Sequence, residues 1–132
     1  MVDERFAVAA LHAWDARRAA AWAQGDRDAL SRLYTRTSSA GRADARLLDR
    51  YAVRGLVVWH MRMQVLRLRV LVAQPSRIVL DVTDRLTGAI AVRVDDDRLR
   101  RALPADGPTS RRLVLRRDGD RWLMAGVSES TP

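Results

Sequence analysis

The sequence predicts an α+β domain in which three N-terminal helices pack on a strongly curved antiparallel sheet of four to six strands. Before Gly55 the chain is rich in alanine, and its apolar residues recur three and four positions apart, as on one face of a helix. After Gly55 apolar and polar residues alternate in steps of two, as in residues 57–63, which is typical of strands. Because the helices precede the strands instead of alternating with them, the pattern excludes the parallel sheet of nucleotide-binding folds.

The length of 132 residues suits a single domain, which we predict over residues 1–132. The chain has no cysteine, and this excludes disulfides and thiolate metal ligands. Its first residues lack the basic and apolar regions of a secretory signal, and no stretch approaches the about 20 apolar residues of a membrane span. We therefore expect a cytoplasmic protein without a transmembrane segment. The alternative is an exported or membrane-anchored domain whose leader is absent from this chain.

The formal net charge of +8 comes from arginine alone, because the 24 basic residues include no lysine. Proteins that grip phosphate usually combine the two residue types, so the absence of lysine looks more like codon bias. The arginines are also spread along the whole sequence, whereas the basic footprint of a DNA-binding protein is clustered. Binding of nucleic acid is therefore not the expected function, and it would depend strongly on salt if it occurred.

The first helix is expected over residues 3–24, because Gly25 suits the left-handed backbone position that follows a helix end. Its alanine-rich inward face is predicted to carry Trp14 and Arg17. So much alanine on one face implies a close approach to the neighbouring element.

Two shorter helices are expected to follow. Asp26 is the predicted N-cap of the second helix. A polar connector at residues 35–41 leads to the third helix, for which Asp44 or one of the serines is the predicted N-cap. This helix is expected to place Tyr51 inward and to end at Gly55.

The apolar segment at residues 57–73 predicts a long strand whose alternation changes phase. Trp59 belongs to a set of odd-numbered apolar residues before the change, and Leu66 belongs to a set of even-numbered ones after it. One extra residue near positions 65–66 would keep both sets on one face, and such a β-bulge bends a strand sharply. The sheet is therefore expected to be strongly curved.

The next strand is expected over residues 78–94, with Asp84 in its inward row and an interruption at residues 87–88. Residues 95–110 are predicted to form a loop in which one helical turn is expected at residues 98–103.

A final hairpin is predicted to pair residues 111–117 with residues 121–128. The Asp-Gly pair at residues 118–119 is a strong signal for a two-residue turn between them. These segments complete the sheet.

The order of these elements resembles the nuclear transport factor 2-like superfamily, in particular its bacterial members. The similar features are three leading helices, the Gly-Asp-x-x-Ala-Leu sequence within residues 25–34, and a bent sheet whose last hairpin carries Trp122. The resemblance covers nearly the whole chain. It implies a cystatin-like cone fold, in which a curved sheet wraps one long helix and leaves a pocket at the open end. The superfamily includes isomerases, dehydratases, epoxide hydrolases, polyketide cyclases and non-catalytic binding domains, so the fold does not choose a function.

Asp84 is the first candidate site residue, because it is the only acid in an otherwise apolar inward row. A buried carboxylate must be paired or hydrogen-bonded, and Arg17 is its predicted partner. The hypothesis is a polar pair in the pocket of the cone, flanked by Trp14, Tyr51 and Trp59. The alternatives are a structural ion pair at the core edge and an aspartate carried to solvent by a bulge.

The two histidines are weaker candidates. The alternation places His60 on the face opposite Trp59, away from the pocket, and His12 is expected to be solvated on the first helix. Isomerases of the superfamily draw a tyrosine from the first helix, which has none here. Its epoxide hydrolases use an aspartate-arginine-aspartate set, but Asp84 and Arg85 are adjacent on one strand and must point to opposite faces.

No cofactor and no metal are expected. The acidic run at residues 95–97 lacks the spaced ligands and the glycine of a calcium loop, and we interpret it as a solvated turn. Phosphate-binding glycine loops and nucleophile-elbow motifs are also missing from the sequence.

The face opposite the pocket is predicted to carry His60, Arg62, Gln64, Arg67 and Arg69. Antiparallel sheets commonly leave one face in water, and this is the expected state of these side chains. The alternative is a homodimer through the outer face of the sheet, since members of the superfamily often pair in that way.

Three functions follow from this sequence, in order of preference. The first is a non-catalytic domain that binds a partner or a small hydrophobic or anionic ligand. The second is a small pocket enzyme of the isomerase, dehydratase or cyclase type, with Asp84 as general acid or base. The third is an electrostatic binder of nucleic acid or of an anionic surface.

Overall fold

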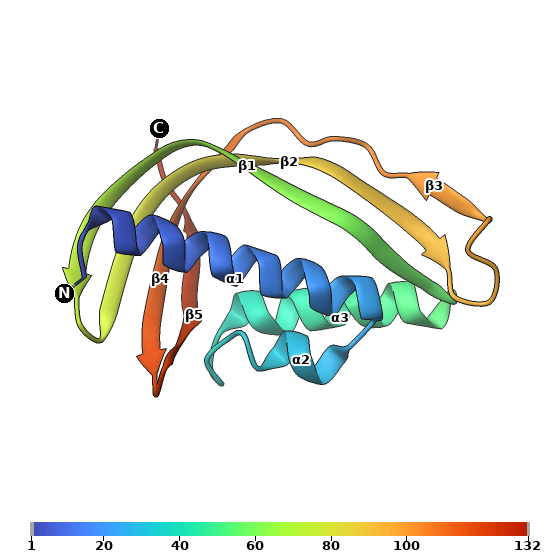
Figure 1. Cartoon of the computed structure of the whole chain (residues 1–132), viewed down its shortest axis with the longest axis horizontal. Coiled ribbons are helices and arrows are strands. Elements are labelled where there is room, and N and C mark those ends of the chain that lie inside the picture. The colour runs from blue at the N-terminus through green and yellow to red at the C-terminus, as the bar shows by residue number, and fades with distance from the viewer. Residues whose placement is uncertain (1, 132) are drawn as a thin grey trace.

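Three helices lie on one side of a curved antiparallel sheet of five strands in the computed structural model, which describes residues 2–131 (Figure 1). The helices precede the strands, so the predicted α+β class is confirmed. The elements are α1 (Glu4–Gln24), α2 (Arg27–Ser31), α3 (Ser39–Val53), β1 (Leu56–Gln74), β2 (Arg77–Arg93), β3 (Arg100–Ala102), β4 (Thr109–Asp118) and β5 (Arg121–Glu129). None of the described helices is long and apolar enough to span a membrane.

Helix α1 begins and ends where the sequence predicts. The carboxylate of Asp3 accepts a hydrogen bond from the backbone N–H of Phe6 at 2.8 Å, and Gly25 has a left-handed φ of 63° after the last turn. The predicted inward face is wrong at one position. Arg17 is exposed, while Arg18 lies on the side that packs against the sheet.

Helices α2 and α3 also have the predicted type of cap. Asp26 caps α2 by accepting a hydrogen bond from the N–H of Ala29, and the hydroxyl of Ser38 accepts one from the N–H of Gly41 at the start of α3. The alternative cap, Asp44, is wrong because this residue lies inside α3. Its side chain is buried.

The sheet has the strand order β1-β2-β4-β5, and β3 pairs with the C-terminal end of β2, beyond the part that pairs with β4. The two long strands, β1 and β2, arch over α1 in Figure 1, and the helices cover only the inner side of the arch. Alternate residues of β2, β4 and β5 point inward and form the core with α1 and α2. The large side chains of this core that are fully buried are Leu11, Leu30, Ile78, Leu80, Val82, Leu113, Leu115 and Met124.

Strand β1 is bent by irregularities in its pairing with β2. The predicted bulge is confirmed, because the register shifts between Val65 and Arg67. A second shift follows Trp59, where His60 has a positive φ of 59°. Val58 before this second shift and Met61 after it both reach the hollow under the arch, so Trp59 is not on the inward face that the sequence predicts.

Strand β2 runs without a break through the predicted interruption. The register shift between Arg62 and Met63 places one extra residue in β2, at Thr87. As a result Ala89 reaches the core, whereas Val94 follows the end of the strand and is 69% exposed.

Two predictions near the C-terminal part of the sheet are wrong in detail. Residues 98–103 do not form a helical turn, because Arg100–Ala102 pairs with β2 as the short strand β3. In the last hairpin Asp118 is directly opposite Arg121, so the turn residues are Gly119 and Asp120. Gly119 supplies the positive φ of 63° that the first turn position needs.

Candidate functional site

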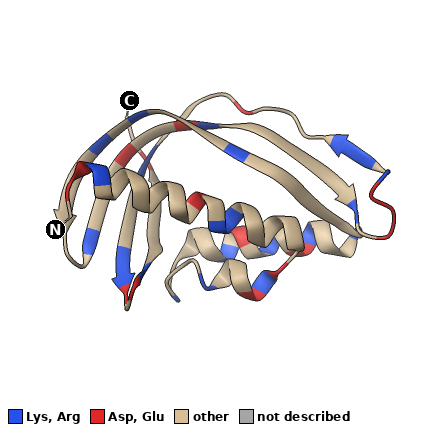
Figure 2. Cartoon of the chain, viewed as in Figure 1, with Lys and Arg blue, Asp and Glu red and all other residues tan. Residues whose placement is uncertain are grey.

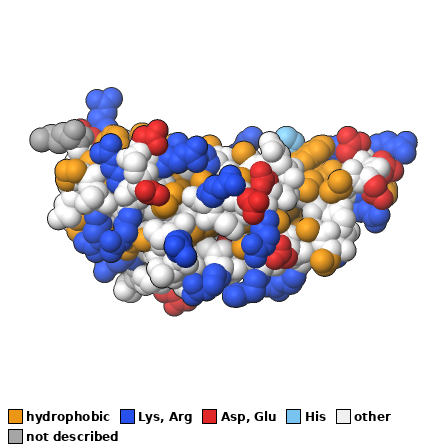
Figure 3. Space-filling model, turned by 90° about the horizontal axis from the view of Figure 1, so that it is seen from below, with side chains coloured by type: hydrophobic (Ala, Val, Ile, Leu, Met, Phe, Trp, Pro, Cys, Tyr) orange, Lys and Arg blue, Asp and Glu red, His pale blue; other side chains and the backbone are white. Residues whose placement is uncertain are grey.

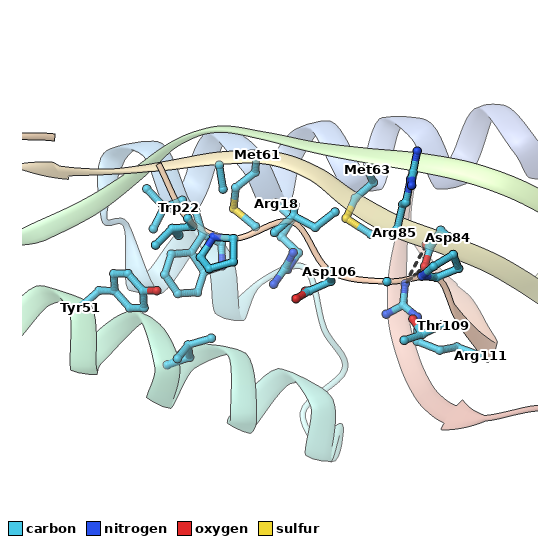
Figure 4. Close-up of a pocket in the computed structure, with 18 residues that line it drawn as sticks. Arg18, Trp22, Tyr51, Met61, Met63, Asp84, Arg85, Asp106, Thr109 and Arg111 are labelled. Atoms are coloured by element: carbon cyan, nitrogen blue, oxygen red, sulfur yellow. Dashed lines mark hydrogen bonds and ion pairs between the residues drawn. The ribbon is translucent and has the colours of Figure 1, made fainter. Parts of the chain in front are cut away.

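A hollow of about 770 Å³ lies under the arch, between the inner face of the sheet and helices α1 and α3. We call it the arch pocket. Its walls come from α1, α3, β1, β2, the start of β4 and the connection between β3 and β4, and Figure 4 shows the side chains. Residues that characterise it are Arg18, Trp22, Tyr51, Met63, Asp84 and Arg111.

One end of the arch pocket is aromatic and apolar. The rings of Trp22 on α1 and Tyr51 on α3 meet edge to face, with centroids 5.6 Å apart. In Figure 4 Met61 on β1 lies beside this end, and Met63 lies farther along the strand, toward Asp84. Aromatic rings and flexible thioethers give an apolar wall that adapts to the shape of a ligand.

The other end of the pocket is polar. Asp84 on β2 is only 2% exposed, and its two oxygens accept hydrogen bonds of 2.9 and 2.8 Å from Nη2 of Arg111 on β4. Arg111 is about one-third exposed, at 32% of its side chain. Its Nε is buried and has no hydrogen-bond partner among the described residues. Thr109, directly opposite Asp84 in the sheet, completes this end.

Arg18 lies between the two ends and is held by Asp44. Its Nε and Nη2 donate to the carboxylate of Asp44 at 2.6 and 2.8 Å. The same carboxylate accepts hydrogen bonds from the hydroxyl of Tyr34 at 2.7 Å and from Nε1 of Trp22 at 3.2 Å. Asp44 therefore joins α1, α3 and the segment after α2 through four donors.

This network fixes the charges of its members. Burial alone would favour the neutral acid, but the donors from Arg18, Tyr34 and Trp22 outweigh burial and lower the pKa of Asp44. Burial and the neighbouring Asp44 raise the pKa of Tyr34, which keeps the phenol protonated. Burial opposes the charge of Arg18, yet its contacts with Asp44 prevail and raise the pKa of the guanidinium.

Asp15, one turn before Arg18 on α1, has a different environment. Burial, and next the charge of Asp84, raise its pKa to about 6, although Arg18, Arg111 and His12 act in the opposite direction. Asp15 makes no side-chain hydrogen bond with any of the residues that the structure describes. It lines a second hollow of about 320 Å³, which we call the side hollow. The side hollow shares Arg18, Leu47, Met63 and Arg111 with the arch pocket.

The structure brings together some of the predicted site residues and separates others. Asp84 and Tyr51 line the arch pocket, and Trp14 lines the side hollow while its Nε1 donates to the carbonyl of Leu33 at 2.8 Å. The predicted pair between Asp84 and Arg17 is wrong, because Arg111 takes that place.

Trp59 is also outside both hollows. The guanidinium carbon of Arg100 lies 5.4 Å from the centroid of its ring. His60 is exposed, as predicted from the alternation, and His12 is exposed on α1.

Within residues 2–131 no three histidine, aspartate or glutamate side chains gather closely enough to hold a metal ion.

Sequence reasoning misses most polar residues of the site, among them Asp15, Arg18, Asp44, Asp106, Thr109 and Arg111. Arg18 follows Arg17 directly, and an error of one position on a helix turns a side chain by about 100°. Arg111 belongs to the predicted last hairpin, and its inward direction is readable, since it is two residues before the buried Leu113. No sequence signal identifies the role of Asp44.

No protein-family model and no curated protein matches this sequence. Solved structures, however, match it over nearly its whole length. The intermembrane space region of the chloroplast protein ARC6 has a TM-score of 0.63 at 15% identity, covering 98% of this chain and 99% of that chain. Aln2 from a Streptomyces species has a TM-score of 0.61 at 10% identity, covering 98% of this chain and 94% of that chain.

A third match carries the name of the fold. A protein with a cystatin-like fold from Caulobacter vibrioides has a TM-score of 0.51 at 11% identity, covering 95% of this chain and 90% of that chain. An NTF2 design has a TM-score of 0.53 at 13% identity, covering 97% of this chain and 100% of that chain. At these identities the likeness concerns the fold. With its bent sheet arched over one long helix, this chain has a cystatin-like cone fold, as these structures do.

Proposed function

We propose that this protein binds a small, largely apolar molecule with a hydrogen-bond-accepting group in the arch pocket. The observation that supports this most directly is the division of the pocket into two ends. Trp22 and Tyr51 suit an apolar or aromatic part of a ligand, and the end at Arg111 and Thr109 suits a polar part. A volume of about 770 Å³ is within the range of small-molecule sites.

The polar groups of the pocket favour a ligand that accepts hydrogen bonds. A guanidinium carries five N–H donors, and Arg18 uses only Nε and Nη2 in its contacts with Asp44. Arg111 bonds Asp84 through Nη2 alone. Asp84 is occupied by Arg111, and Asp44 behind the wall is occupied by Arg18, whereas Asp106 on the connection between β3 and β4 lines the pocket with no ion pair among the described residues. The spare N–H groups of the two arginines still outnumber this one free carboxylate as hydrogen-bonding groups. A carboxylate or a carbonyl oxygen on the ligand fits this surplus.

The hydrogen bonds of Asp84 and Asp44 also favour a binding function over a catalytic one. Asp84 is paired with Arg111, and Asp44 accepts from four donors, so neither of these buried carboxylates is available as a base without breaking a contact. The remaining acid of the pocket lining, Asp106, is exposed on the connection between β3 and β4, where water surrounds it. A binding domain needs no proton transfer, and its function is compatible with ion pairs that stay closed.

An anilinonaphthalene sulfonate dye tests the proposal, because it combines aromatic rings with an anionic acceptor group. Saturable binding with one site per chain is expected by fluorescence titration. Met61→Trp fills the apolar end and is expected to weaken binding by at least about tenfold, which is about 1.4 kcal/mol. Val53→Trp is the matched control, since Val53 is 84% exposed and lies outside the pocket. Equal binding by the two tryptophan variants would contradict the proposal.

A second candidate function is favoured by Asp15. This carboxyl has a pKa raised to about 6, while Asp84 nearby is paired with Arg111. Two carboxyl groups in unequal environments can divide the roles of acid and base, as in proton-transfer enzymes of the isomerase or dehydratase type. The test is incubation in D₂O of a molecule that copurifies with the protein. Deuterium incorporation that Asp15→Asn abolishes would favour the enzyme, and its absence would favour the binding domain.

A further inference from the structure

Figure 2 shows basic positions along the strands of the arch, and many of these arginine side chains are exposed. Residues directly opposite each other in a sheet share a face, so the pairing shows which arginines belong together. Arg69 on β1 and Arg112 on β4 both lie opposite Asp81, and Arg85 lies opposite Gln64, with which it hydrogen-bonds at 2.8 Å. We define the outer arginine face by Arg67, Arg69, Arg77, Arg85, Arg112 and Arg116.

The outer arginine face carries mostly positive charge, and few acids balance it. The acid that lies among these arginines is Asp81, whose Oδ1 is 2.9 Å from Nε of Arg112 and whose Oδ2 is 3.6 Å from Nη2 of Arg69. A further acid, Asp118 at the end of β4, lies opposite Arg121, so these two charges balance each other. Six arginines and one aspartate leave a formal excess of five positive charges, out of +8 for the whole chain. In Figure 3, which views the molecule from below, acidic and basic side chains lie side by side instead.

One pair on the face is unfavourable for the isolated protein. Arg77 on β2 lies directly opposite Arg116 on β4, and both side chains are exposed. Like charges in directly opposite positions of a sheet are destabilising. Neither guanidinium is within ion-pair distance of a carboxylate among residues 2–131. An anion that bridges the two guanidinium groups would convert this repulsion into binding energy.

The arginines are spread along the sequence, which argues against nucleic-acid binding, but the fold gathers six of them on one face. We propose that the outer arginine face binds the phosphate backbone of a flexible single-stranded nucleic acid. Guanidinium groups form paired hydrogen bonds with phosphate oxygens, so arginine is better suited to this contact than any other side chain. The six side chains follow the curve of the arch, and a flexible strand can follow the same curve. None of the six positions is flanked on that face by an aromatic ring on which a base could stack, so contacts are to phosphates and the sequence preference is weak.

The curvature and the charge argue against three other occupants. A flat bilayer touches only the crest of an arch, which leaves most of the six arginines without a contact. A second copy of the chain stacked face to face would bring two excesses of five positive charges together. A folded acidic protein would need a concave surface that matches the arch, whereas a single strand needs none.

The test compares two triple variants by fluorescence anisotropy with a labelled single-stranded oligonucleotide of mixed sequence. Arg67→Gln, Arg77→Gln and Arg116→Gln together remove half of the face without breaking an ion pair. Arg42→Gln, Arg46→Gln and Arg50→Gln remove the same charge from exposed positions of α3. Each lost phosphate contact lowers the affinity by about fivefold at about 0.1 M salt, so the face variant is expected to lose about a hundredfold. The control is expected to bind as the wild type does.

Salt dependence gives a second readout. Six contacts to a single strand predict a slope of about −4 for the logarithm of the binding constant against the logarithm of the salt concentration, and three contacts predict about −2. Equal losses in both triple variants would overturn the proposal, because they would show a response to net charge alone. Tighter binding of the wild type to vesicles of anionic phospholipid or to polyglutamate would also overturn it. Dimerisation in light scattering that only the face variant loses would assign the face to a second copy instead.

Discussion

Asp84 on β2 receives both of its hydrogen bonds from Arg111 on β4, although the two residues are not directly opposite each other in the sheet. Asp84 is opposite Thr109, and Arg111 is opposite Val82, so the ion pair runs diagonally between the strands. It lies where the sheet bends over the arch pocket. The pair therefore joins the structure of the sheet to the polar end of the site.

Replacing Asp84 by asparagine is expected to lower the free energy of unfolding by about 2 kcal/mol. The amide cannot balance the charge of Arg111, whose buried Nε already lacks a partner. The loss stays moderate because the guanidinium is partly exposed and can hydrate. Urea denaturation measures it, with Asp49→Asn as control, since Asp49 forms an exposed ion pair with Arg27. Equal losses in the two variants would contradict a special role of the diagonal pair.

Asp15 is expected to make the protein less stable as pH rises from about 4 to about 6. Its pKa in the folded protein is about 6, raised from 3.8, so the folded state holds the proton over this window while the unfolded state releases it. Asp15→Asn removes the cost of ionisation. It is expected to add about 1 to 2 kcal/mol at pH 8, after allowance for partial exposure, and to change little at pH 4. A stability gain that is equal at both pH values would contradict this prediction.

Asp44 is expected to have the opposite effect from Asp15, because it makes the protein more stable as the pH rises from acidic values. Its pKa is lowered in the folded protein, so its contribution is fully present above its ordinary pKa of 3.8 and is lost as the pH falls through the lower folded value. Tyr34→Phe removes one donor from this carboxylate and is expected to lower stability at pH 7 by about 2 kcal/mol. It should also move acid unfolding to higher pH.

Circular dichroism during an acid titration measures both effects of Tyr34→Phe. The control is Tyr51→Phe, because the hydroxyl of Tyr51 makes no hydrogen bond in the described part of the chain. If both variants unfold at the same pH, Tyr34 does not support the charge of Asp44.

Gly41 is expected to tolerate no side chain. A Cβ at this position would lie 2.7 Å from Cβ and Cγ of Tyr34, which is closer than packing allows. Gly41→Ala is therefore expected to cost about 1 to 3 kcal/mol and to displace the Tyr34 hydroxyl from Asp44. Thermal unfolding tests this against Gly107→Ala, where nothing lies within 4 Å of the added Cβ. A similar small change in both variants would contradict the close approach.

The fold is predictable because its signals are local. Asp3, Gly25 and Asp26 mark helix ends by their own backbone and side-chain chemistry, which does not depend on the rest of the protein. The bulge near Leu66 is also visible in the sequence, since charged residues on both sides show where the alternation changes phase.

The second bend of β1 is not predictable from alternation. Val57, Val58 and Trp59 are all apolar, so the pattern does not reveal which of them faces the core. The structure places Val58 inside and bends the strand at His60. This explains why alternation alone places Trp59 in the pocket.

The polar contacts of the site depend on tertiary packing. Asp84 is identifiable as an acid in an apolar row, but its partner Arg111 is 27 residues away, and only the register of β2 and β4 brings the two together. The role of Asp44 likewise requires α1 and α3 to be side by side, as its contacts with Arg18 and Trp22 show. The sequence order alone does not contain this information.

The methionine methyl groups provide the most direct test that the arch pocket binds a ligand. Met61 and Met63 line the pocket, whereas Met124 is buried in the core beside the side hollow. In NMR spectra of protein labelled with carbon-13 at the methionine methyls, addition of the naphthalene sulfonate dye is expected to shift the signals of Met61 and Met63 together. The signal of Met124 should move much less. Saturable dye binding that leaves Met61 and Met63 unchanged would contradict the account.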